Sequence, residues 1–309
     1  MNRVSTSGNY QSALLNLMAS QQQQADANNR VSTQKNATDL SGFGRSSEAV
    51  TALKAASNRV QGFLDTGETV GARLEAQDLA LNRVIDGVGG AREAIAGVLS
   101  TDSASTLMLD LESHFASVTG GLNTRHQGGY LFGGANTTQQ PVSVANLSDL
   151  AAAPTVASTF NNDTIKPVSR VAENTSLETG YLASDLGSTI FQIFKDIKAY
   201  NDNPLTGPLT GRPTDAQEAF LTTQLARLDA ARTSAIDTTA RNGALQKQVE
   251  QIGQSHTAQL KSLDEMVSKH TDADMAKAVT DLQQAQIAVQ ASAQVISQLR
   301  DVSLLNYLR

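Results

Sequence analysis

The sequence predicts a mainly α-helical fold in which long, antiparallel, coiled-coil-like helices from both chain ends flank a small β-containing insert. All six prolines lie between Pro141 and Pro213, so the residues that break helix interiors are confined to the middle of the chain. Both ends carry narrow apolar stripes at helical spacing. Only 4% of the 309 residues are aromatic and none is Trp, which favours long, thin helices over a thick core.

The first helix is expected from about residue 10 to residue 34. Its apolar stripe is thin, and its other faces carry Gln and Asn, including the run QQQQ at 21–24. The stripe consists of Leu14, Met18, Ala25 and Val31. Because most helix stability comes from a packed apolar face, this helix needs a partner. A break is expected over residues 36–44, which contain DLSGFG.

A second, longer helix is predicted by a seven-residue period, which indicates a coiled-coil-like seam. The period runs through Leu53, Val60, Gly67, Leu74, Leu81, Val88 and Ile95. Five glycines between 67 and 90 would each destabilise this helix by about 1 kcal/mol relative to Ala. They also permit a close approach of another backbone, and the sequence leaves both interpretations open.

The middle of the chain mixes proline with Val-, Thr- and Asn-rich runs. VSVANL and PTVASTF resemble short strands, and IKPVSRV is expected at a sheet edge because it contains Pro167. Helical spacing returns over residues 182–197 and stops at the turn-rich run NDNPLTGPLTGRP.

The last part is expected to be helical from about residue 214 onward. Within HTDADMAKAV, Asp272 and Asp274 are typical of a helix cap with acidic residues in the first turn. The final helix has an almost unbroken apolar row with alternating spacings of four and three. That row is Ala278, Leu282, Ala285, Val289, Ser292, Ile296 and Leu299.

Composition argues against several classes of function. The net charge of −6 and the absence of any Lys/Arg cluster argue against a nucleic-acid partner. The absence of Cys excludes disulfides, Cys-bound zinc and thiol nucleophiles. No stretch approaches the ~20 apolar residues of a membrane span, and the N-terminal residues do not resemble a cleaved signal peptide. We therefore expect that the chain does not insert into a membrane. Any export is expected to use a route without a cleaved leader.

No catalytic, cofactor-binding or metal site is expected. The four histidines, at 114, 126, 256 and 270, never fall three or four residues apart, so none forms a local helical metal pair. The run GGYLFGGAN contains Gly129-x-x-x-x-Gly134, but Ala135 and Asn136 stand where a phosphate loop needs Lys and Ser or Thr. Asp272 and Asp274 lack the Gly and the distant Glu of a calcium loop.

Two stretches carry a resemblance to a known family. The C-terminal run DADMAKAVTDLQQAQIAVQASAQVISQLRDVSLLNYLR resembles the terminal helix of the bacterial flagellin superfamily. Within that superfamily, NTRHQGGYLFGGANTTQQP and the ending SLLNYL are similar to the hook–filament junction members. The resemblance covers residues 1–140 and 182–309. DLSGFGRSSEAV departs from it, because many members have an Asp/Pro-rich turn there.

The resemblance implies a three-part organisation. Residues 1–40 and 275–309 would form an inner, terminal coiled-coil domain, and residues 41–136 and 182–274 a helical rod. Residues 137–181 would form a proline-containing, partly β outer insert. The terminal helices would be disordered in the free monomer and would pack together when copies assemble.

The resemblance also implies a role outside the cell, in the bacterial flagellum at the hook–filament junction. Expected partners are other copies of the chain in a ring, the hook-side junction protein, flagellin and an export chaperone. The family is structural and is exported through the flagellar type III apparatus without signal cleavage. Two alternatives remain: a flagellin-type filament subunit, and a secreted coiled-coil translocator or effector.

Two sets of residues are expected to carry this role. The expected assembly interface comprises Leu14, Leu17, Met18, Ala25, Val31, Met275, Val279, Leu282, Val289, Ile296, Leu299, Leu304, Leu305, Tyr307 and Leu308. The expected structural turn and anchor comprises Gly128, Gly129, Tyr130, Leu131, Phe132, Gly133 and Gly134, where the glycines turn the backbone and the bulky residues hold it against the rod.

Overall fold

The computed structural model describes residues 3–305, and the side chains of residues 8–299. Residues 1–59 and 258–309 form one compact unit, and residues 60–257 form a second. We call them the terminal unit and the central unit. The boundary between them falls within two long helices, whereas the three-part organisation expected from the sequence follows the helix breaks. That organisation remains a prediction.

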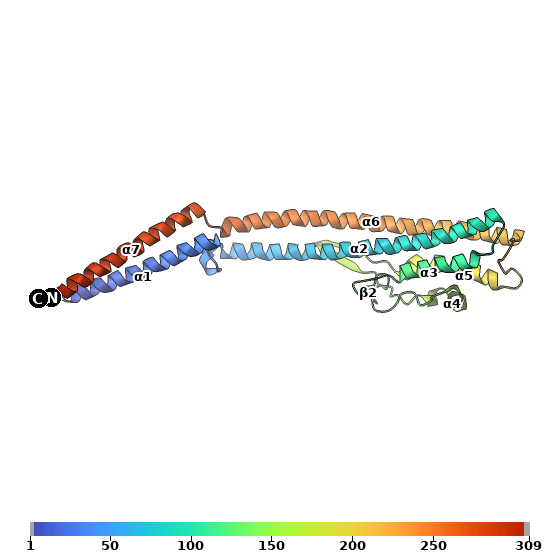
Figure 1. The fold of residues 1–309 in the computed structure, drawn as a ribbon, viewed down its shortest axis with the longest axis horizontal. Helices are drawn as coiled ribbons and strands as arrows, with labels where there is room; N and C mark the ends of the chain where they lie inside the picture. The colour runs from blue at the N-terminus through green and yellow to red at the C-terminus, as the bar shows by residue number, and fades with distance from the viewer. Residues whose placement is uncertain (1–2, 306–309) are drawn as a thin grey trace. The chain divides into compact units, whose positions relative to one another are not determined.

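The described residues are mainly helical, which confirms the predicted fold class (Figure 1). The α-helices are α1 (Arg3–Thr33), α2 (Ser47–Thr101), α3 (Leu107–Leu122), α4 (Leu147–Ala152), α5 (Ala183–Asp202), α6 (Asp215–Thr271) and α7 (Met275–Leu305). Two short 3-10 helices cover Ser41–Ser46 and Ala157–Thr159. The strands are β1 (Arg125–His126), β2 (Gly129–Tyr130), β3 (Val168–Ala172) and β4 (Thr175–Glu178).

The central unit is built on α2 and α6, which lie side by side (Figure 1). The Asn242 amide donates a 2.8 Å hydrogen bond to the Leu74 carbonyl oxygen, and Arg92 pairs with Asp229. The predicted seven-residue row of α2 is confirmed as a packing face. From Leu74 onward its members are fully buried at Leu74, Leu81, Val88 and Ile95.

Helices α3 and α5 complete the main core beneath α2. The Phe115 ring of α3 packs 5.0 Å from Phe191 and 5.3 Å from Phe194, both on α5. Helix α3 approaches α2 closely at Gly121, where an added Cβ would lie 2.9 Å from the Ala80 carbonyl oxygen. At the same crossing, an added Cβ at Gly87 of α2 would lie 2.9 Å from the His114 carbonyl oxygen, so close backbone approach applies to this one of the five glycines.

The insert contains one hairpin rather than three strands. Strands β3 and β4 pair antiparallel, and the predicted strand that contains Pro167 is confirmed as β3, which begins at Val168. The predicted strands at VSVANL and PTVASTF are wrong. Only a single bridge, Val142 with Phe160, forms there. Asn146 instead caps α4, because its side chain accepts a 2.8 Å hydrogen bond from the Asp149 amide.

The hairpin is held against both long helices. The His256 Nε2–H donates a 2.8 Å hydrogen bond to the Val171 carbonyl oxygen, and the Gln77 amide donates one of 3.1 Å to Thr179. Val171 is fully buried and packs with Leu74 and its neighbours in a small second core. This hairpin is the β-containing part of the insert that the sequence predicts.

In the terminal unit, α1 and α7 run antiparallel, side by side (Figure 1). The predicted first helix is confirmed, although α1 begins at Arg3 rather than near residue 10. A 3-10 helix over residues 41–46 fills the predicted break, and α2 begins at Ser47. Helix α7 begins at Met275, just after the capping residue Asp274, whose carboxylate accepts from the Ala276 amide at 3.0 Å.

Candidate assembly interface

The contact between α1 and α7 follows a narrow row on each helix, which we call the seam. Apart from the partly buried Arg30, Asp281 and Ala288, these rows hold the buried or partly buried residues of two otherwise exposed helices. On α1 the row is Ala13, Leu17, Ser20, Gln24, Ala27 and Val31, and on α7 it is Ala278, Leu282, Ala285, Val289, Ser292, Ile296 and Leu299. The row predicted for α7 is therefore confirmed as its packing face.

The packing face predicted for α1 is wrong in most of its members. Leu14 and Met18 are 41% and 60% exposed, and Ala25 is also exposed, whereas Val31 lies in the seam. The seam instead passes through Ala13, one residue before Leu14. Its fully buried members are alanines, such as Ala27 and Ala278 at 4% and 3% exposure.

The residues expected at the assembly interface whose side chains are described fall into two groups. Leu17, Val31, Leu282, Val289, Ile296 and Leu299 lie in the seam, within one chain. Leu14, Met18, Ala25, Met275 and Val279 are exposed. The side chains of Leu304 and Leu305, and all of Tyr307 and Leu308, lie outside the described residues. The exposed group alone is free in this chain to contact another molecule.

Several exposed apolar residues of the pair were missed by the sequence analysis. Leu15 and Ile287 are 66% and 65% exposed, and Val295 and Tyr10 are 48% and 41% exposed. Each stands off the apolar row of its helix, and a large apolar residue on a polar helix face is the signal that could have indicated it. With Leu14, Met18, Met275 and Val279, they form what we call the outer apolar set.

Two shallow grooves run along the pair beside the seam. One, of about 400 Å³, is lined by polar residues and alanines, and Arg30 and Asp281 form an ion pair of 3.7 Å at its edge. The other, of about 450 Å³, is lined by Ala13, Ala291, Ser292 and Val295 among others. Small side chains on both helices leave these hollows, so α1 and α7 do not fill the space between them.

Residues 34–36 and 271–273 join the pair where α1 ends and α7 begins, and we call them the clamp. The Asn36 amide donates to the Thr271 carbonyl oxygen at 2.7 Å, and the Ala273 amide donates to Gln34 at 3.0 Å. Lys35 and Asp272 form an antiparallel bridge and an ion pair. Lys35 first, and then the Ser268 hydroxyl, lower the pKa of Asp272 from 3.8 to about 2, because both donate hydrogen bonds to its carboxylate.

The turn GGYLFGGAN lies in the central unit. Leu131 and Phe132 are 3% and 0% exposed and belong to the main core. The Ala183 amide donates a 3.0 Å hydrogen bond to the Phe132 carbonyl oxygen, which ties the turn to the start of α5. Tyr130 is only partly buried, and its ring centroid lies 5.1 Å from the guanidinium carbon of Arg125.

The glycines of this turn differ in what their backbone requires. Gly128 and Gly134 have φ of 86° and 71°, in the left-handed region that favours glycine, whereas Gly129 pairs within the β1–β2 hairpin. Gly133 is buried and bridges to Leu182. An added Cβ at Gly134 would lie 3.0 Å from the Ile165 carbonyl oxygen, so the insert closes over this position.

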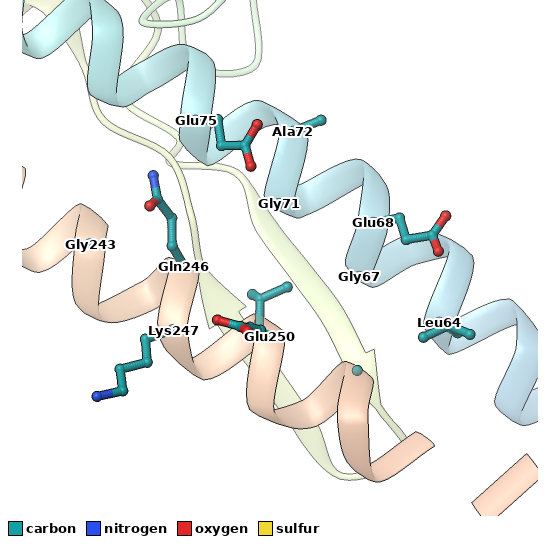
Figure 2. Close-up of a pocket in the computed structure, with 12 residues that line it drawn as sticks. Leu64, Gly67, Glu68, Gly71, Ala72, Glu75, Gly243, Gln246, Lys247 and Glu250 are labelled. Atoms are coloured by element: carbon teal, nitrogen blue, oxygen red, sulfur yellow. The ribbon is translucent and has the colours of Figure 1, made fainter. Parts of the chain in front are cut away.

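A wider groove of about 670 Å³ separates α2 and α6 in the central unit (Figure 2). Figure 2 shows the facing sides of the two helices, with strands β3 and β4 behind them. Glycines line both sides, at Gly67 and Gly71 of α2 and at Gly243 and Gly253 of α6. Glu68, Glu75 and Glu250 line it as well, together with Lys247.

Among the described residues, no three His, Asp or Glu side chains gather in a group that could hold a metal ion. Over the same part of the chain, no helix combines the length and the apolar character needed to cross a bilayer. The four histidines are dispersed. His256, for example, stacks on Phe63 at 5.8 Å, while the His114 ring fills the space over Gly90.

The C-terminal part of this chain is similar to a known family. Residues 225–308 match the bacterial flagellin C-terminal helical region. The match covers most of α6 and all of α7, and it confirms the resemblance to the flagellin superfamily over that region. No curated protein sequence matches this chain.

Solved structures of flagellar hook-associated proteins have the same fold. One from Vibrio parahaemolyticus superposes with a TM-score of 0.61 at 15% identity, covering 75% of this chain and 100% of that one. Hook-associated protein-3 from Legionella pneumophila gives 0.57 at 12% identity, covering 71% and 98%. FlgL from Bacillus cereus gives 0.53 at 15% identity, covering 70% and 97%.

Proposed function

We propose that this chain is a structural subunit of the bacterial flagellum that forms the adaptor ring between the hook and the flagellin filament. The observation that carries the proposal is the flagellin C-terminal helical region at residues 225–308, because α7, half of the terminal pair, lies within it. The shared fold with flagellar hook-associated proteins supports the junction role over other flagellar roles. The proposed role is structural and requires no catalysis.

Assembly follows from the outer apolar set. A single chain leaves Leu15, Met18 and Ile287 at least 60% exposed, although burying a large apolar side chain fully stabilises by about 1.5–3 kcal/mol. Copies packed side by side would bury these residues against one another. We therefore propose that the pair α1/α7 is the contact between copies in the ring.

The same features give the terminal pair a low stability in the free chain. Its fully buried seam residues are alanines, which remove little apolar surface from water, and its large apolar residues outside the seam stay exposed. Helices of this kind depend on a packed apolar face for stability. We propose that α1 and α7 are disordered in the free monomer and order on assembly, so that subunits do not polymerise before they reach their site.

The proposed division of labour follows the expected parts of the chain. Residues 1–40 and 275–309 form the inner assembly domain, and residues 41–136 and 182–274 form the rod. Residues 137–181 form an outer insert held by Leu131 and Phe132. Proposed partners are other copies, the hook-side junction protein, flagellin and an export chaperone. The proposed location is outside the cell, after export without a cleaved signal peptide.

Deletion of the gene, followed by electron microscopy of the cells, tests the junction role. Hooks without filaments, with flagellin released into the medium, are expected, and the intact gene should restore filaments. Filaments of normal length in the deletion strain would overturn the role.

Complementation with surface variants tests the interface. Leu15→Glu with Ile287→Glu places charges in the outer apolar set and should leave hooks bare. The matched control is Gln21→Glu with Gln294→Glu, which adds the same charges at exposed polar positions of the same helices. Equal filament numbers with both variants would refute the proposed contact.

A filament subunit is the second candidate, because the matching region is that of flagellin itself. The two roles differ in self-assembly. A filament subunit polymerises alone into long filaments when the purified protein is concentrated, whereas a junction subunit does not. Electron microscopy of concentrated protein separates them.

A further inference from the structure

The seam between α1 and α7 repeats itself every seven residues. On α7, small residues stand at 278, 285 and 292 and large apolar ones at 282, 289 and 296. On α1, small residues stand at 13, 20 and 27, seven apart, and larger ones at 17, 24 and 31. If one helix slides by seven residues along the other, each small or large residue of the seam therefore takes the place of another residue of the same size class. Packing alone distinguishes such registers poorly.

Other contacts along the pair add little discrimination. Between the described parts of α1 and α7, Arg30 and Asp281 form an ion pair, and their side chains are 43% and 35% exposed. Exposed ion pairs contribute little to stability, and salt screens them. The grooves of about 400 and 450 Å³ beside the seam also mean that no tight interlocking opposes a slip.

The clamp, by contrast, pairs specific residues. Its two backbone hydrogen bonds, from the Asn36 N–H to Thr271 and from the Ala273 N–H to Gln34, join residues 34–36 to residues 271–273 in one register only. The Asn36 amide side chain adds a 2.8 Å hydrogen bond to the Asp272 carbonyl oxygen. The Asp272 carboxylate accepts from Lys35, Ser268 and Thr271, so its position is fixed from both sides of the clamp.

The ends of both helices start from the clamp. Helix α1 ends at Thr33, and Gln34 follows with φ of 58°, a left-handed conformation that ends helices. Helix α7 begins at Met275, two residues after Ala273. With so few residues between the clamp and either helix, a slip of seven residues cannot occur while the clamp is closed, because a slip moves one helix by about 10 Å.

We propose that the clamp sets the register of α1 against α7, with Lys35 and Asp272 as its positioning residues. The seam supplies the affinity between the two helices, and the clamp selects one of several seven-residue registers that the seam permits. That choice fixes which exposed apolar residues of α1 lie beside those of α7. The inference concerns the fold of the pair and does not depend on the flagellar role.

Distance measurement between two spin labels tests the proposal in the full chain. The chain contains no Cys, so Gln11→Cys and Lys277→Cys, both at exposed positions far apart along the pair, create the only labelling sites. Sucrose is added because it favours the compact state, and far-UV circular dichroism shows that the helices are formed. Pulsed electron resonance on frozen samples should give one narrow distance.

The clamp variant replaces Gln34, Lys35, Asn36 and Asp272 by Gly. It keeps the chain length but removes the side-chain contacts and the conformational restriction of the clamp. We expect a second distance about 10 Å from the first, at undiminished helicity, as one helix slips by seven residues. The control variant, Arg30→Gln with Asp281→Asn, removes the ion pair of the seam and should keep the single narrow distance.

Three results would overturn the proposal. A single, unchanged distance in the clamp variant would mean that the seam itself selects the register. Loss of both the defined distance and the helicity would mean that the clamp holds the helices together rather than choosing their register. A second distance in the control variant as well would likewise assign the register to the ion pair.

Discussion

Replacing Gly71 or Gly243 by Ala is expected to stabilise the central unit, whereas replacing Gly121 is expected to destabilise it. All three glycines lie inside long or medium helices. At Gly71 and Gly243, a new methyl group would meet no heavy atom of the described residues within 4 Å beyond its own helical surroundings. At Gly121 it would lie 2.8 Å from Val84 Cγ2 and 2.9 Å from the Ala80 carbonyl oxygen.

The magnitudes follow from these distances. Gly in a helix interior is less favourable than Ala by roughly 0.5–1 kcal/mol, because the unfolded chain loses more freedom on folding. Gly71→Ala and Gly243→Ala should gain about that amount each. At Gly121 the same gain is opposed by an overpacking cost of about 1–3 kcal/mol. Since the Ala80 oxygen belongs to the backbone of α2 and cannot rotate away, we expect a net loss of about 1–2 kcal/mol.

Urea unfolding of the full chain, followed by far-UV circular dichroism, measures these changes. The midpoint should rise for Gly71→Ala and fall for Gly121→Ala, at an unchanged dependence on urea. In thermal unfolding, at about 2–4 °C per kcal/mol for a unit of this size, the rise should be about 1–4 °C. A loss of stability in Gly71→Ala comparable to that in Gly121→Ala would refute the reasoning, because it would show that the α2/α6 groove is closed in solution.

Three further predictions concern the clamp, the turn and the terminal helix. Because the pKa of Asp272 is lowered to about 2, its carboxylate stabilises the fold above about pH 4, and this contribution is lost as the pH falls towards 2. The free energy of unfolding, measured from pH 2 to 5, should therefore depend less on pH in Asp272→Asn than in the unmodified chain. Phe132→Ala, at a fully buried side chain, should cost about 3–5 kcal/mol in urea unfolding, and the partly exposed Tyr130→Ala clearly less; equal losses would contradict this. Deletion of residues 275–309 should abolish assembly while the central unit keeps its helicity and cooperative melting.

The long helices could be predicted because their burial pattern repeats many times. Leu74, Leu81 and Val88 recur every seven residues on one face of α2, and all are buried. The strand predicted at VSVANL failed for the opposite reason. A run of six residues carries little periodic signal, and one side chain, Asn146 as a helix cap, was enough to decide the local structure.

The candidate interface was only partly predictable. A narrow stripe identifies an amphipathic helix but does not show which of two neighbouring rows is buried. Ala13 and Leu14 are adjacent, and which of them is buried depends on how α7 packs against α1. The predicted row followed Leu14 and Met18, which are exposed, whereas the structure places Ala13 and Ala27 in the seam. Leu15 and Ile287 were missed because residues off the stripe become significant only once the packed face is known.

The two units bury apolar surface in different ways, and under the proposed function this difference gives only the terminal pair a need for partners. In the central unit the clustered rings of Phe115, Phe191 and Phe194 close a core within one chain. In the terminal pair, alanines occupy the buried seam positions, and large residues such as Leu15 and Ile287 face outward. Exchanging these arrangements, with large residues inside and small ones outside, would stabilise the pair in a single chain. It would also remove the apolar surface that we propose as the contact between copies. The proposed instability of the isolated pair and its proposed capacity to assemble therefore have the same structural cause.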